Sequence, residues 1–236
     1  MMVETAKRWA GPRATVLARC LWRGHPIPRW GNLRRTAPFS AVFGFERGTP
    51  VDRYYLHGFL SAHRDRITGD VLEVQTTSYT ERFGQGVRRA DSFDIATEFS
   101  PTHLCDFAHC EDVIPSASYD CLLLPNTLPH FRELDLALAQ ARRIVRPGGT
   151  ILASAAGLIP LTGDAPEYSR LTPDGWRDRL ASAWPAASID VDGHGNCLAA
   201  IASQLGLATE ELSAPELDVY DARYPVLITI ACRLPQ

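Results

Sequence analysis

The sequence predicts an α/β fold whose largely parallel sheet is covered by helices on both faces. Short apolar runs alternate with segments whose apolar residues recur at helical spacing, and no internal repeat is found among them. Strands that are apolar throughout are typical of parallel sheets, because such sheets are buried on both faces. A length of 236 residues with 45% apolar content allows one full core, so we expect one globular domain with additional segments.

Residues 1–50 are predicted to form a basic N-terminal arm or lid rich in proline and glycine, and residues 51–236 the main domain. The prolines and glycines of the arm interrupt helices and allow at most one short helix, near residues 14–22. Residues 1–45 carry eight basic residues against one acidic residue, a net charge of +7 that leaves −10 on the rest of the chain. The opposite charges favour packing of the arm against the body, and contact with a polyanion is the alternative.

The first half of the main domain is expected to contain one helix and four strands. Apolar residues at helical spacing follow Asp52, and Gly69 separates this helix from the first apolar strand. The later runs are too short for helices. The four expected strands cover residues 71–74, 87–90, 102–107 and 119–124.

The second half alternates helices with two further strands. The helix predicted over 133–145 ends in basic residues that suit a helix C-terminus. Pro147 and Gly148 after it fit the second and third positions of a type II turn. Thr172 and Pro173 are an N-cap and a first-turn proline that open another helix, and an apolar helix begins near Cys197. The expected strands cover 150–155 and 226–232.

Composition argues against several classes of protein. No stretch approaches the roughly 18 consecutive apolar residues of a membrane helix, and the run 14–21 is too short and too interrupted by arginine for a secretory signal. Six scattered cysteines in a chain of this size do not suggest a disulfide scaffold. We therefore expect a cytoplasmic protein without a membrane span.

Several segments carry a resemblance to a known family. They are Val71–Val74, Asp91 after the second strand, Cys105–Phe107 after the third, Ser118–Leu124 as the fourth, and Ala141–Thr150 before the fifth. In this order and spacing they resemble a class I S-adenosylmethionine-dependent methyltransferase over residues 71–155. The lead-in Phe43–Tyr55 resembles a bacterial, type 11-like branch of the family. The resemblance implies a Rossmann-like fold with a seven-strand, mostly parallel sheet.

The resemblance also implies S-adenosylmethionine as the cofactor and assigns residues at strand ends to it. Asp91 would accept hydrogen bonds from the ribose hydroxyls, whereas Asp94 is expected in the following loop. Asp106 would accept from the adenine amino group, with Phe107 donating its backbone N–H. Glu73 would order the first loop and lie toward the methionine ammonium. The further cofactor-binding residues expected are Gln75, Thr76, Asn126 and Tyr54, the last as part of a lid.

The first loop departs from the family pattern. Class I methyltransferases usually carry E-x-G-x-G-x-G there, because glycine allows close approach of the backbone and a positive φ. Gln75, Thr77 and Tyr79 stand at the three glycine positions. The type 11-like branch tolerates a glycine-poor loop followed by a tyrosine and Arg-Phe-Gly, which matches residues 79–84. Aspartate is also common in strand-end turns, so a turn role for Asp91 and Asp106 stays open.

His130, just past the fourth strand, is the candidate catalytic residue. A histidine with a near-neutral pKa can take a proton from an acceptor hydroxyl, although a solvated loop histidine is the alternative. His194, in a Gly-His-Gly turn, is a weaker candidate for a substrate contact.

No metal site is expected. Residues 103–110 contain two histidines and two cysteines, but their spacing does not match that of a zinc site.

The predicted reaction is methyl transfer to a small molecule, on an oxygen of a sugar or natural product, with an insertion at 159–171 over the acceptor pocket. In-line positioning of the sulfonium and the acceptor supplies most of the rate enhancement in such a reaction, so no nucleophile motif is expected. The alternative is a protein of the same fold that does not methylate, either a biosynthetic cyclase or rearrangement catalyst or an inactive partner subunit. A nucleic-acid substrate is a further, weaker alternative because the body lacks a basic and aromatic cluster.

Overall fold

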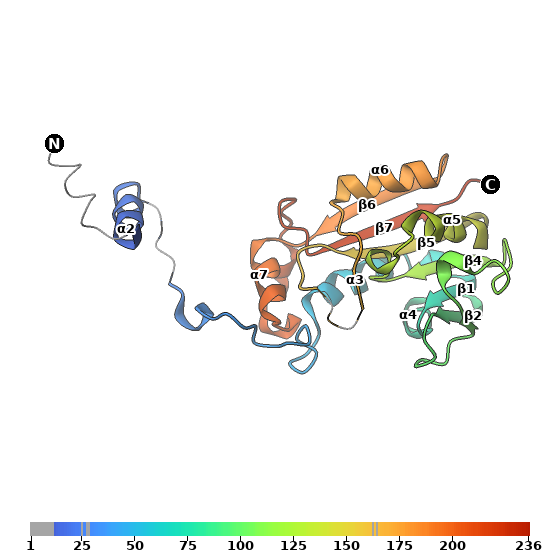
Figure 1. Cartoon of the computed structure of the whole chain (residues 1–236), viewed down its shortest axis with the longest axis horizontal. Coiled ribbons are helices and arrows are strands. Elements are labelled where there is room, and N and C mark those ends of the chain that lie inside the picture. The colour runs from blue at the N-terminus through green and yellow to red at the C-terminus, as the bar shows by residue number, and fades with distance from the viewer. Residues whose placement is uncertain (1–11, 25, 27–28, 162, 164) are drawn as a thin grey trace. The chain divides into compact units, whose positions relative to one another are not determined.

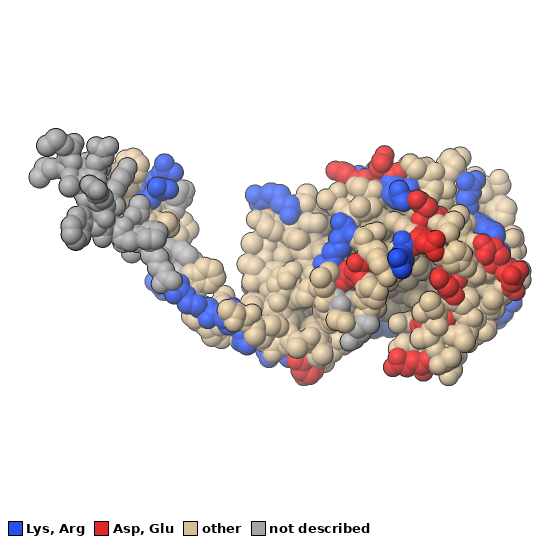
Figure 2. Space-filling view, viewed as in Figure 1, with Lys and Arg blue, Asp and Glu red and all other residues tan. Residues whose placement is uncertain are grey.

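The computed structural model describes residues 12–24, 26, 29–161, 163 and 165–236. The chain forms two compact units, residues 1–37 and residues 38–236 (Figure 1). The first unit contains helix α2 (Pro12–Trp22) and the single-turn helix η1 (Gly31–Leu33), and Trp22 and Trp30 are exposed. Glu4, Lys7 and Arg8, which contribute to the net charge of the predicted arm, lie outside the described residues. Within the second unit, Figure 2 shows acidic and basic side chains interspersed on the visible face.

The second unit contains a seven-stranded sheet with the order β3-β2-β1-β4-β5-β7-β6. Its first five strands pair in parallel, and β7 runs antiparallel to both of its neighbours, β5 and β6. The predicted α/β fold and mostly parallel seven-strand sheet are therefore confirmed. The strands are β1 (Gly69–Val74), β2 (Val87–Asp94), β3 (His103–Leu104), β4 (Tyr119–Leu124), β5 (Val145–Ala156), β6 (Ser188–His194) and β7 (Leu227–Arg233).

Helices cover both faces of this sheet (Figure 1). Helices α5 (Leu134–Ile144) and α6 (Pro173–Ala183) pack into one hydrophobic core. The other core is formed against α3 (Val51–Ala62), α4 (Ser78–Phe83), α7 (Cys197–Leu205) and the short α8 (Ala214–Asp218). Two separate cores, one on each face, explain why the central strands are apolar throughout.

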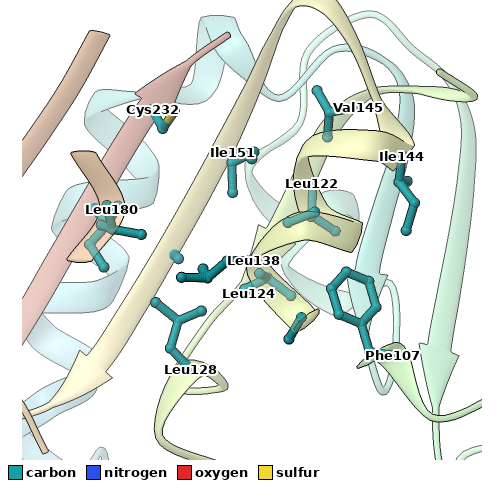
Figure 3. Packing of buried hydrophobic residues seen from close by; sticks show 14 of the residues in the cluster. Phe107, Leu122, Leu124, Leu128, Leu138, Ile144, Val145, Ile151, Leu180 and Cys232 are labelled. Atoms are coloured by element: carbon teal, nitrogen blue, oxygen red, sulfur yellow. The ribbon is translucent and has the colours of Figure 1, made fainter. Parts of the chain in front are cut away.

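Strand β4 shows this two-sided burial most clearly. Leu122 and Leu124 join the core beneath α5, where Leu138 also lies (Figure 3). Cys121 and Leu123, at the alternate positions, belong to the core on the opposite face. All four side chains are fully buried, as the two-residue side-chain period of a strand requires when both faces are covered.

Several element boundaries differ from those predicted. β2 continues four residues beyond Ala90, and the strand expected over 102–107 shortens to β3 followed by a single helical turn, η3 (Phe107–His109). α5 ends at Ile144, and β5 begins directly after it, with a register shift before Thr150. Gly148 has φ +73°, as the predicted type II turn needs. Thr172 is confirmed as the N-cap of α6, since its Oγ1 accepts from the Gly175 N–H at 3.2 Å.

Residues 38–50 belong to the same compact unit as the sheet. The Phe39 N–H donates to the Leu205 carbonyl at 2.7 Å, and the Thr49 N–H donates to Glu210 Oε2 at 2.9 Å. Gly206 has φ +67°, and a Cβ atom there would lie 2.5 Å from the Ser40 carbonyl oxygen, so only glycine allows this close approach. The compact unit that holds the sheet thus begins at residue 38, and the division predicted at residue 50 stays a prediction. The lid role predicted for residues 1–50 stays a prediction.

Candidate functional site

The carboxyl ends of the parallel strands meet at one edge of the sheet, where open α/β sheets bind their ligands. β1 ends at Val74 and β2 at Asp94, and the Gln75 N–H donates to the Phe93 carbonyl at 2.8 Å. The chain after β3 joins the same edge, because the Cys105 N–H donates to the Asp94 carbonyl at 2.9 Å. The residues that follow β1, β2, β3 and β4 therefore surround a common edge, which we call the carboxyl edge.

Glu73 orders the loop that follows β1. Its side chain is 1% exposed, and its carboxylate accepts from the Tyr79 N–H at 3.0 Å, the Thr80 N–H at 2.7 Å and the Thr80 hydroxyl at 2.7 Å. These donors belong to the first turn of α4, whose backbone N–H groups have no partner within the helix. Burial raises the pKa of Glu73, and the hydrogen bonds from Thr80 and Tyr79 oppose that shift.

The glycine-free loop adopts a glycine-like backbone. Gln75, at the first position where the family carries glycine, has φ +64° and an exposed side chain. Only glycine adopts this region at no steric cost, so the fold holds Gln75 in a strained conformation. Thr76 continues the turn, with its N–H on the Val74 carbonyl at 2.8 Å and its hydroxyl on Ser78 Oγ at 3.0 Å.

Asp91 does not lie at a strand end, so that prediction is wrong. β2 continues to Asp94, and Asp91 pairs with Leu72 in the middle of the sheet. Its carboxylate accepts from the Tyr119 hydroxyl at 2.6 Å and pairs with Arg89 at 3.2 Å. Its carboxylate is therefore held by groups within the sheet, three residues before β2 ends at the carboxyl edge.

Asp94 takes the strand-end position that was expected for Asp91. It is the last residue of β2, and its Oδ1 accepts from the Ala96 N–H at 2.9 Å, which closes a turn and uses one of its two oxygens. The alternation of Ser92, Phe93 and Asp94 was the signal available in the sequence, because a buried aromatic residue between two polar ones continues a strand.

Asp106 and Phe107 come after β3, from which only Cys105 separates them. The exposed Asp106 caps the helical turn η3 through the Ala108 N–H at 3.0 Å. The Phe107 ring is buried between Phe93, at a centroid distance of 4.4 Å, and Phe131, at 5.4 Å. The ring therefore belongs to the core, and the backbone of Phe107 is the part that could serve a ligand.

Asn126 joins the end of β4 to two other elements. Its N–H donates to Ser154 Oγ of β5 at 2.8 Å, and its Nδ2 donates to Asp52 Oδ2 of α3 at 2.9 Å. Asp52 is buried and also pairs with Arg53 at 2.5 Å. Asp52 was not predicted as a site residue, although an acidic residue in the first turn after Pro50 was visible in the sequence. Four carboxylates, Asp52, Glu73, Asp94 and Asp106, thus surround the carboxyl edge.

His130 faces the segment that follows β5. Its Nδ1 lies 3.0 Å from the Pro166 carbonyl oxygen, and because a carbonyl only accepts, Nδ1 carries the proton. The neutral ring then has its lone pair on Nε2, the atom that could act as a base. The same segment is fixed by the Tyr168 N–H on the Pro129 carbonyl at 2.7 Å.

Arg170 closes the expected insertion at 159–171 into a compact loop. Its guanidinium group donates to the carbonyls of Gly157 at 3.1 Å and Pro160 at 3.0 Å, and it pairs with Glu167 at 2.7 Å. Residues 166, 168 and 169 of this segment bond to the turn that contains His130, and sequence reasoning did not single out Arg170.

Tyr54 is directed to another part of the molecule. Its hydroxyl donates to Asp218 of α8 at 2.6 Å, and its ring lines a cavity beside the end of β6. His194 borders the same cavity, with its Nε2 2.7 Å from Thr229 Oγ1. The structure therefore groups Tyr54 with His194 and not with the loop after β1, and its predicted cofactor contact gains no support from this geometry.

The two histidines of residues 103–110 bond to different elements. His103 bonds to the Tyr119 hydroxyl at 2.8 Å, and His109 pairs with Glu133 at 2.7 Å. Among the described residues, no three histidine, cysteine, aspartate or glutamate side chains are grouped closely enough to hold a metal ion.

Comparison with known proteins agrees with this architecture. Residues 78–153 match the family model of a methyltransferase domain, and no curated protein matches the chain. An S-adenosylmethionine-dependent methyltransferase of Mesorhizobium loti is 14% identical, with a TM-score of 0.52 over 75% of this chain and 96% of the other. One from Archaeoglobus fulgidus is 13% identical, with a TM-score of 0.53 over 82% and 100%. The cyclase SpnF is 14% identical, with a TM-score of 0.50 over 80% and 84%.

The strand order, the covered sheet and the matched segment define a protein of the class I methyltransferase fold. The resemblance predicted from the sequence is therefore confirmed, since the fold agrees and residues 78–153 match the family model of a methyltransferase domain. In the described part of the chain, no helix is both long enough and apolar enough to cross a membrane.

Proposed function

We propose that this protein transfers a methyl group from S-adenosylmethionine to a small-molecule acceptor. The observation that supports it is the set of carboxylates at the carboxyl edge, with Asp94 and Asp106 following neighbouring strands β2 and β3. Carboxylates suit a ligand that offers ribose hydroxyls and an adenine amino group, because an ionised carboxylate accepts charge-assisted hydrogen bonds. These carboxylate acceptors fit S-adenosylmethionine, although the loop after β1 has no glycine.

Each residue has a defined part in holding the cofactor. Asp94 accepts from the two ribose hydroxyls, and Asp106 accepts from the adenine amino group beside the backbone of Phe107. Glu73 acts indirectly, because it fixes the loop from Gln75 to α4 at the methionine end. S-adenosylmethionine, when bound, supplies an electrophilic methyl group, and the protein contributes positioning.

The acceptor is an oxygen of a sugar or natural product that enters between the end of β4 and the loop closed by Arg170. His130 takes the proton of that hydroxyl on Nε2, the ring nitrogen left free of a proton by the contact with Pro166. This assignment rests on the orientation of the ring and on the position of His130 just past β4.

Titration calorimetry with S-adenosylhomocysteine tests the proposal. We expect binding in the micromolar range and a rise in melting temperature through linkage, because the ligand binds only the folded chain. The absence of both heat and thermal shift at millimolar ligand would refute cofactor use.

That negative result would favour a second candidate, a protein of the same fold that does not methylate. The strained Gln75 in place of glycine is the observation that favours this alternative, because it adds a side chain to the backbone closest to the expected methionine end.

A further inference from the structure

A cavity of 360 Å³ lies beside the carboxyl end of β6 and is separate from the residues assigned to the cofactor. Its size is at the lower end of small-molecule sites, which span about 300–1,000 Å³. Three elements form its walls: α3, the end of β6, and α8 with the residues after it. The side chains that define it are Tyr54, Tyr55, Asp192, His194, Asp218 and Tyr220.

The cavity is acidic. Asp192, on the exposed edge strand β6, and Asp218, at the end of α8, both line it. None of the described residues that line it is a lysine or an arginine. The nearby Arg223 is paired with Asp221 at 2.6 Å. Burial lowers the pKa of His194 against the opposing effect of Asp192, which disfavours a cationic ring beside the two carboxylates.

Aromatic rings complete the walls. The Tyr55 ring stacks on His194 at a centroid distance of 5.9 Å, and Tyr54 meets Tyr55 edge to face at 5.5 Å. The Tyr220 hydroxyl lies 3.8 Å from the position that a Cβ atom would take at Gly193, so Tyr220 covers the end of β6. Aromatic faces attract organic cations, and carboxylates beside them add a Coulombic contribution.

We propose that this cavity binds the protonated amine or quaternary ammonium group of a small organic cation, and that this cation is part of the methyl acceptor. Among the described residues, no third histidine, cysteine or acidic side chain joins Asp192 and Asp218 to form a metal site. The two carboxylates therefore favour an organic cation over a metal ion. Rings that surround a charge are suited to an alkylammonium group, which makes weak hydrogen bonds and has an apolar surface.

The link to the acceptor rests on the proposed function and on the position of the cavity. Ala156 of β5 and His194 of β6 both pair with Leu227 of β7, so the cavity lies at the same edge of the sheet as the ends of the parallel strands. Helix α3 contacts both places, because Asp52 bonds to Asn126 while Tyr54, two residues later, lines the cavity. A single acceptor could therefore place its cationic end here and its reacting oxygen near the end of β4.

Choline and neohexanol are the probes for the full-length protein. Neohexanol is the uncharged isostere of choline, in which a carbon atom replaces the nitrogen, so the comparison isolates the charge. We expect saturable choline binding by titration calorimetry or ligand-observed NMR, in the millimolar range for so small a probe. Neohexanol should bind at least about fivefold more weakly, the effect of a single charge contact near a protein surface.

Matched variants locate the site. Asp192→Asn and Asp218→Asn should each weaken choline binding about five- to tenfold, since each removes one charge without changing side-chain size. Asp190→Asn is the control, because Asp190 is an exposed residue of the same strand that does not line the cavity. Equal binding of choline and neohexanol, no choline binding at all, or equal losses at all three aspartates would each overturn the proposal.

A parallel titration with S-adenosylhomocysteine separates the two proposals. If the nucleoside binds and choline does not, only the cation site is refuted. If choline binds at Asp192 and Asp218 while the nucleoside does not, the cation site stands, and the protein is not a methyltransferase that uses this cofactor.

Discussion

Replacement of Asp94 by alanine should weaken the binding of S-adenosylhomocysteine about ten- to a hundredfold. Asp94 ends β2 at the carboxyl edge, and its bond to the Ala96 N–H occupies only Oδ1. Two charge-assisted hydrogen bonds to the ribose hydroxyls contribute about 1.5–3 kcal/mol, which corresponds to that range in the dissociation constant. The free energy of unfolding should fall by no more than about 1 kcal/mol, the value of the single lost turn bond.

Asp91→Ala is the matched comparison and should behave in the opposite way. Its carboxylate accepts from the buried Tyr119 hydroxyl at 2.6 Å and pairs with Arg89. His103 still bonds to that hydroxyl at 2.8 Å after the substitution, so we expect a loss of about 1–2 kcal/mol of stability rather than more. The affinity of the Asp91→Ala variant for S-adenosylhomocysteine should be unchanged.

Titration calorimetry gives the two affinities, and urea unfolding followed by circular dichroism gives the two stabilities. The argument from strand ends would be refuted if Asp91→Ala weakened nucleoside binding more than Asp94→Ala and left the stability unchanged.

Three further predictions concern the elements around the site. Glu73→Ala should lower the free energy of unfolding by about 2–4 kcal/mol in urea, because three buried donors lose their acceptor, and a loss below about 0.5 kcal/mol would contradict this. Gln75→Gly should be at least as stable as the natural chain, by about 0–1 kcal/mol, since it relieves a positive φ, and a clear loss in the same assay would show that the Gln75 side chain contributes to the loop. Hydrogen bonds from Arg47 and from the Ala208 N–H lower the pKa of Glu211 from 4.5 to about 2, so the stability from this group is present above pH 4.5 and is lost as the pH falls toward about 2. Acid titration of Glu211→Gln should show a weaker loss over that interval, and an identical acid profile would mean that Glu211 does not make these hydrogen bonds in solution.

Local signals predicted much of the fold. The uninterrupted apolar run of β4 indicated a strand buried on both faces, and the structure divides it between two cores. Thr172 and Pro173 marked the start of α6, because capping depends on residues within one turn of each other. Glu73 was singled out because a carboxylate in an apolar strand needs partners, and Tyr79 and Thr80 supply them six and seven residues later.

Features that depend on contacts between distant residues were decided only by the tertiary structure. The sequence could not fix the end of β2, because pairing of Phe93 with Val74 of β1 extends that strand past a polar stretch that locally resembles a turn. It could not show that Tyr54 bonds to Asp218, 164 residues away, and lines the cavity beside β6. The sequence by itself therefore determined which residues form strands, helices and caps, where the interactions are local or the burial is two-sided. The chain's long-range pairing decided which carboxylates reach the carboxyl edge, since that depends on where neighbouring strands stop.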